Sequence, residues 1–213
     1  TLGGTTTVTA SSGVATFTNV TLSGVVGTNY VLRFAASGLS SADSGNVTVS
    51  SGTATQLGIA TQPVGGASGA VLSTQPVIAI RDAQGNTVTG DSSTQVTVSI
   101  HSGAGGALGG TTTVTASSGV ATFTNVTLSG VVGTNYVLRF AASGLSSADS
   151  GNVTVSSGTA TALGIATQPV GGASGAVLST QPVVAIRDAQ GNTVTGDSST
   201  QVTVSIQDRK STR

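Results

Sequence analysis

The sequence predicts an all-β protein made of tandem sandwich units, each with about seven strands. Thr, Ser, Gly, Val and Ala dominate the composition, and β-branched residues such as Val and Thr favour strands. A nearly perfect internal repeat runs through the chain with a period of 106 residues. Charged residues make up only 7% and the net charge is zero, whereas disordered chains combine low hydrophobicity with high net charge. We therefore expect a folded array.

The repeat relates residues 1–100 to residues 107–206. Only three pairs differ: Thr1/Ala107, Gln56/Ala162 and Ile78/Val184. The match ends abruptly where His101 faces Gln207. We expect residues 208–213 to be a non-native tail, because their codons resemble a sequencing adapter; the alternative is a genuine basic terminus. The chain contains no Met, so we expect it to be a fragment that lacks a natural start.

Alternating apolar and polar residues predict the strands of one period. They fall at 57–61, 77–80, 96–100, around Val114, and at 121–123, 136–140 and 153–155. Turn chemistry separates them: 82–86 and 117–119 supply Gly and Asn, and 130–135 and 143–151 are expected to be loops. Pro63 and Pro76 are expected at strand ends. About seven strands in roughly a hundred residues is the number found in immunoglobulin-like sandwiches.

The stretches Ser51-Gly52-Thr53 and Ser157-Gly158-Thr159 give the clearest unit boundaries, because each follows a last strand and precedes a first one. We therefore expect 53–158 to be one complete unit. Residues 1–52 are then the C-terminal half of the preceding unit, and 159–207 are the N-terminal half of the next.

Three segments carry a family resemblance: 76–88 (PVIAIRDAQGNTV), 95–99 (QVTVS) and 119–123 (GVATF). In their order they resemble the bacterial immunoglobulin-like repeats of the invasin/intimin type (group 1). The resemblance implies Greek-key β-sandwiches stacked into a rod-like stalk, at the cell surface or outside the cell, that holds an adhesive tip away from the cell. Repeats of this kind usually lack catalytic residues.

Few residues are suited to catalysis or metal binding. His101 is the only His, so no Ser/His/Asp set can recur in each unit, and we predict neither an enzyme nor a cofactor site. Asp82 and Asp91 are the only candidate metal ligands, for Ca²⁺, if they meet across the loop between two strands. The favoured alternative gives Asp82 an Asx-turn role or a salt bridge to Arg81 or Arg139.

Aromatic residues are scarce, and each period has only Phe123, Tyr136 and Phe140. We expect all three in the core, since aromatic side chains bury the most area per residue. Tyr136 is also expected to direct its hydroxyl to a backbone group. An exposed aromatic platform for carbohydrate is the alternative.

The predicted partners are the neighbouring repeats of the same array. Arginines at 33, 81, 139 and 187 are too widely spaced to form a nucleic-acid surface. The sequence contains no apolar run of about 18 residues, the length that a membrane-spanning segment needs.

A spacer is therefore the first functional hypothesis. The second is a binding module that contacts a receptor, glycan or other surface through Thr-rich faces such as 111–113. Complementary half-units further predict head-to-tail self-association by strand addition.

Overall fold

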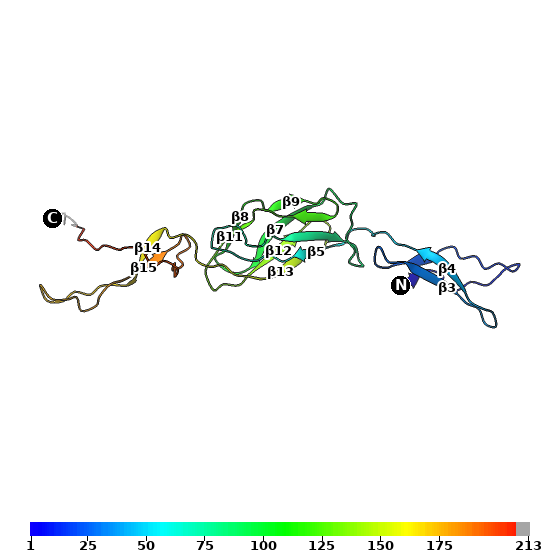
Figure 1. The fold of residues 1–213 in the computed structure, drawn as a ribbon, viewed down its shortest axis with the longest axis horizontal. Helices are drawn as coiled ribbons and strands as arrows, with labels where there is room; N and C mark the ends of the chain where they lie inside the picture. Colours follow the sequence, from blue (N-terminus) through cyan, green and yellow to red (C-terminus); the bar gives the residue numbers. More distant parts are fainter. Residues whose placement is uncertain (208–213) are drawn as a thin grey trace.

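The chain folds into an elongated all-β molecule, seen in a computed structural model that describes residues 1–207 (Figure 1). Three parts follow one another along the long axis, with the thickest in the middle. The predicted all-β class is confirmed: residues 1–207 contain strands, turns and no helix. No helix in this range is therefore long and apolar enough to cross a membrane. The predicted tail, 208–213, lies outside the described residues.

Fifteen strands make up this part of the chain. The first part holds β1 (Leu2–Gly3), β2 (Thr21–Leu22), β3 (Tyr30–Phe34) and β4 (Ala42–Val47). The middle part holds β5 (Gln56–Thr61), β6 (Val77–Arg81), β7 (Gln95–Ser102), β8 (Ala107–Gly109), β9 (Thr113–Thr115), β10 (Val120–Thr122), β11 (Thr127–Ser129), β12 (Tyr136–Ala141) and β13 (Ala148–Val153). The last part holds β14 (Ala162–Thr167) and β15 (Val183–Arg187).

The middle part contains two larger antiparallel sheets. One has the strand order β10-β6-β5 and the other the order β13-β12-β7-β9. The register in the second sheet places Phe140 opposite Val98 and Leu138 opposite Ile100. Because side chains alternate across a strand, this pairing puts the apolar residues of β7 and β12 on one face.

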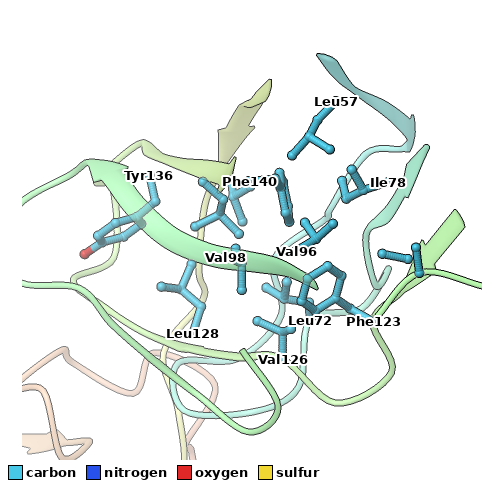
Figure 2. Packing of buried hydrophobic residues seen from close by; sticks show 14 of the residues in the cluster. Leu57, Leu72, Ile78, Val96, Val98, Phe123, Val126, Leu128, Tyr136 and Phe140 are labelled. Carbon is cyan, nitrogen blue, oxygen red and sulfur yellow. The ribbon is translucent and has the colours of Figure 1, made fainter. Parts of the chain in front are cut away.

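Both sheets contribute to a single hydrophobic core (Figure 2). Its fully buried members include Ile78 and Ile80 from β6, Val96 from β7, Leu138 and Phe140 from β12, and Phe123 and Tyr136. The rings of Phe123 and Phe140 pack with their centroids 5.7 Å apart. The predicted core position of the three aromatic residues is therefore confirmed in the middle part. Burying each large side chain contributes roughly 1.5–3 kcal/mol relative to leaving it exposed.

The two outer parts expose or only half-bury the hydrophobic residues that the middle part buries. Val96 and Val98 are 0% and 3% exposed, whereas their repeats Val202 and Val204 are 45% and 87% exposed. Within residues 1–207, every buried hydrophobic residue lies between Leu57 and Val155. Nearly identical sequences thus differ in burial because only the middle part has both sets of strands.

Three features of the strand prediction were wrong. The strand predicted at 153–155 shares only Val153 with the observed strand β13. The structure adds β8 and β11, which pair with each other, so the middle part has nine strands instead of about seven. Their sequences, ALG and TLS, contain at most one β-branched residue each, so they give little indication of a strand. Part of the predicted loop 143–151 belongs to β13, whose sequence ADSGNV has low strand propensity and is held by pairing with β12.

Candidate functional site

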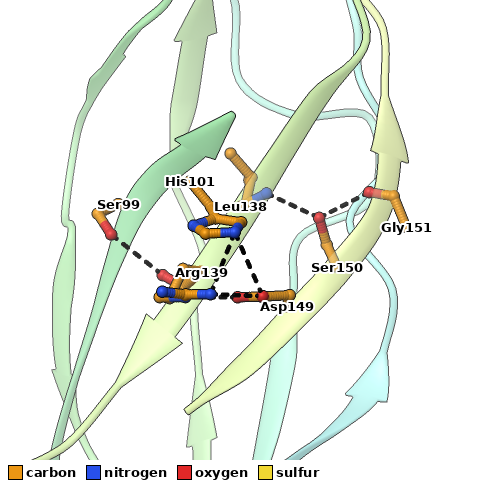
Figure 3. Close-up of polar contacts among 7 residues, drawn as sticks. All are labelled: Ser99, His101, Leu138, Arg139, Asp149, Ser150 and Gly151. Carbon is orange, nitrogen blue, oxygen red and sulfur yellow. Dashed lines mark hydrogen bonds and ion pairs between the residues drawn. The ribbon is translucent and has the colours of Figure 1, made fainter. Parts of the chain in front are cut away.

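His101 lies near the end of β7, beside an ion pair that joins β12 to β13 (Figure 3). Arg139 donates from Nε and Nη2 to the two carboxylate oxygens of Asp149, both at 2.7 Å. His101 Nε2 lies 3.2 Å from Arg139 Nη2 and 3.8 Å from Asp149 Oδ2. The hydrogen bond from Arg139 lowers the pKa of Asp149. Ser99 turns its hydroxyl toward the Arg139 carbonyl, so no serine–histidine pair forms here.

The ion pair is a feature of the repeat. Arg33 and Asp43, the equivalents of Arg139 and Asp149, make the same two hydrogen bonds at 2.7 and 2.8 Å. Because the pair joins two neighbouring antiparallel strands in both copies, we interpret it as a cross-strand contact on the outer face of the sheet.

Asp82 begins the turn that follows β6. Its Oδ1 accepts the backbone N–H groups of Gln84 and Asn86, at 3.0 and 2.9 Å, which is an Asx-turn arrangement. The Asx-turn prediction is therefore confirmed, whereas the predicted salt bridge is absent within residues 1–207. Arg139 pairs with Asp149 instead, and Arg81 Nε is buried without a hydrogen-bond partner.

Asp91, the second candidate metal ligand, caps its own loop. It accepts the N–H groups of Ser93 and Thr94 and the hydroxyl of Thr94. Hydrogen bonds from Thr94 lower the pKa of Asp91. Both carboxylates thus accept hydrogen bonds from their own turns, and among residues 1–207 no group of three or more His, Cys, Asp or Glu residues is placed to hold a metal.

The turn after β6 has a second role, because it contacts the preceding part of the chain. The Asn86 side chain donates to the Gly24 carbonyl at 3.0 Å and accepts the Val26 N–H at 3.0 Å. Asp82 Oδ2 accepts the Gly52 N–H at 2.9 Å. The turn at 82–86 thus binds two segments of the preceding part: the loop at 24–26 and the linker at Gly52.

The same contact recurs one period later. Asn192 donates to the Gly130 carbonyl at 2.9 Å and accepts the Val132 N–H at 2.8 Å. Asp188 Oδ2 accepts the Gly158 N–H at 2.8 Å. We call each of these contacts a repeat joint: the first joins residues 24–52 to 82–86, and the second joins 130–158 to 188–192.

Aspartate and asparagine cooperate within each joint. Asn86 Nδ2 also donates to Asp82 Oδ2 at 3.0 Å, and Asn192 Nδ2 donates to Asp188 Oδ2 at 2.9 Å. Hydrogen bonds from the Asn86 side chain and the Gly52 backbone lower the pKa of Asp82 to about 2. At Asp188 burial acts to raise the pKa, but hydrogen bonds from Asn192 and Gly158 outweigh it, so the net pKa is lowered. The carboxylates are therefore ionised at neutral pH.

Sequence reasoning identified Asp82 but missed the joint. Residues 82–86 show ordinary turn chemistry, and nothing in that pattern indicates that Asn86 binds another unit. The partner residues, Gly24, Val26 and Gly52, lie 30 to 62 residues away in the chain. One signal could have indicated the joint: if units stack end to end, the turn at 82–86 and the Ser-Gly-Thr boundary at 51–53 are expected at the same end of the unit.

Comparison with known proteins adds no family assignment: no protein-family model and no curated protein matches the chain.

Proposed function

We propose that the chain is part of a tandem array of immunoglobulin-like repeats that serves as a spacer in a bacterial cell-surface or secreted adhesin-like protein. In this proposal 53–158 is the complete repeat, and its partners are the repeats on either side. The repeats position another part of the protein and carry out no catalysis themselves.

The observation that carries this proposal is the recurrence of one joint at the period of the sequence repeat. Both joints use equivalent residues and link consecutive parts along the long axis (Figure 1). A spacer needs this property, since its reach must grow with the number of units. The low charge of the chain also fits a spacer, because a nearly neutral surface attracts few charged partners.

A binding module is the second candidate, favoured by one surface feature. Thr97 of β7 and Thr113 of β9 are exposed neighbours with their hydroxyl oxygens 3.0 Å apart. Gln95 and Thr115 are also exposed on these paired strands. Such a hydroxyl-rich face offers hydrogen bonds to a glycan or another ordered polar surface.

A binding assay separates the two candidates. The chain is immobilised and tested against a glycan panel and intact host cells, with Thr97→Val/Thr113→Val as a matched variant of similar side-chain shape. The spacer proposal predicts no saturable binding by either protein. If the chain binds saturably and the double variant does not, the spacer proposal is wrong and the binding-module proposal takes its place.

A further inference from the structure

We infer that the turn 82–86 and its repeat 188–192 form a dedicated docking surface for the preceding repeat, which fixes the direction and angle at which units stack. This inference rests on the proposed spacer function and deepens it by naming the partner surface: the loops at 24–26 and 130–132 together with linker residues Gly52 and Gly158. It gives the joint a defined geometry in place of a free hinge.

The first argument is that the docking asparagine uses both of its hydrogen-bonding groups. The Asn192 amide donates to the Gly130 carbonyl and accepts the Val132 N–H, with a carboxylate oxygen of Asp188 as a further acceptor. Asn192 and Asp188 are both buried. A buried amide with donor and acceptor both used fixes its orientation, because turning it over would place like groups against each other.

The second argument is the close fit around the linker. A Cβ added to Gly158 would collide with the carbonyl oxygen of Ser68, so the linker passes here only as glycine. Ser68 itself is buried; its hydroxyl accepts the Gly130 N–H at 2.9 Å and lies 3.0 Å from Gln190 Oε1. Residues of the middle part thus contact the linker on one side and the docking turn on the other.

The third argument is directional. The turn at 82–86 of the middle part binds the preceding part of the chain, at residues 24–26. The loop at 130–132 of the middle part binds the following part, at Asn192. The two surfaces are different, so the contact is heterologous and repeats without closing, which builds a line of units with one polarity. Two copies of the same surface cannot make this contact with each other.

The loop at 130–132 permits a substitution that removes one hydrogen bond of the second joint. This substitution leaves the turn at 188–192 unchanged. The Thr134 N–H bonds to the Val131 carbonyl, and Gly133 has φ +86°, which places Val132 at the second position of a β-turn. Proline is common at that position and has no N–H. Val132→Pro therefore suits the turn while deleting the donor to Asn192.

Distance distributions between two spin labels test the joint in the full chain. The chain has no Cys, so Ser102→Cys and Thr195→Cys introduce the only two labelling sites, both at exposed positions on either side of the second joint. We expect a narrow distance distribution in this labelled background. Val132→Pro and Asn192→Ala should each broaden it at least twofold. Asn125→Ala, which removes an acceptor for Thr111 N–H within the middle part, should leave it narrow.

Unchanged widths in both joint variants would overturn the inference, as would a broad distribution before any joint substitution. Agreement between Val132→Pro and Asn192→Ala excludes local damage to the 188–192 turn as the cause, since only the second variant alters that turn. The spin-label experiment measures internal geometry, so it is independent of the binding assay. Saturable ligand binding would contradict the spacer proposal without affecting the inference about the joint. A flexible joint would contradict that inference without affecting the spacer proposal.

Discussion

At the residue scale, the aspartate of each joint couples the structure to pH. The pKa of Asp82 is lowered to about 2 by donors from Asn86, Gly52 and Gln84, which are amides and do not titrate. A carboxylate with a depressed pKa stabilises the fold above its unfolded pKa of about 3.9, and this stabilisation is lost as pH falls through the folded pKa. We therefore expect the joint to be intact at neutral pH and to weaken between about pH 4 and pH 2.

Carboxylate titration by NMR checks this expectation. The Asp82 side-chain carbon signal should move with a midpoint near pH 2, in step with a loss of protection of the Gly52 N–H against hydrogen exchange relative to its intrinsic rate. A midpoint close to about 3.9, the ordinary aspartate value, would contradict the hydrogen-bonding pattern described for this turn.

Tyr136 links the core to the second joint. Its ring is fully buried, and its hydroxyl accepts the Val131 N–H at 2.8 Å and donates to the Ala104 carbonyl at 3.2 Å. Tyr136→Phe should keep the core and lose roughly 1–2 kcal/mol of unfolding free energy, since two backbone groups lose a partner. Tyr30→Phe, the equivalent change in the less buried first part, should cost less.

Urea unfolding of the two variants measures this difference. Equal losses for Tyr136→Phe and Tyr30→Phe would mean that burial of the hydroxyl and its hydrogen bonds adds nothing to stability, contrary to this prediction.

At the element scale, the repeat supplies its own matched control for packing. Phe140 on β12 is 0% exposed, whereas Phe34 on β3 has the same sequence neighbours and is 43% exposed. Phe140→Ala should cost about 3–5 kcal/mol of unfolding free energy, the usual range for a buried phenylalanine. Phe34→Ala should cost well under half of that. Thermal or urea unfolding decides, and similar costs at the two sites would show that the outer strands are packed as tightly as the middle ones.

The strands that sequence patterns predicted are those with clear runs or alternation of apolar residues. Val96, Val98 and Ile100 on β7 repeat at every second position, and β6 contains the continuous apolar run 77–80. β8 (ALG) and β11 (TLS) were missed because they contain fewer β-branched residues than the equally short β9 (TVT) and β10 (VAT), and their pairing with each other sets their conformation. The same reason hides the joint: Asn86 is recognisable as a turn residue, but its partners are set by how units stack.

At the scale of the whole molecule, the exposed outer strands predict self-association. Residues 159–207 repeat the first half of the middle part and 1–52 repeat its second half, and each exposes apolar residues whose equivalents are buried there. Because the two halves lie at opposite ends of the molecule, only a second copy can bring them together (Figure 1). We expect residues 1–207 to form head-to-tail oligomers at high concentration.

Light scattering over a concentration series measures this, with residues 53–158 as the control that lacks both halves. The mass of 1–207 should rise with concentration while that of 53–158 stays monomeric. A monomer at every concentration for both proteins would show that the outer strands do not complete each other.

The central claim is that these units form a spacer, and length against repeat number tests it most directly. Arrays of two, four and eight copies of the 106-residue repeat would be compared by small-angle X-ray scattering. With strands of up to eight residues lying along a unit, each repeat should add a constant few tens of ångströms, so the maximum dimension should grow in proportion to repeat number. A maximum dimension that levels off, or grows only as the square root of repeat number, would contradict the spacer.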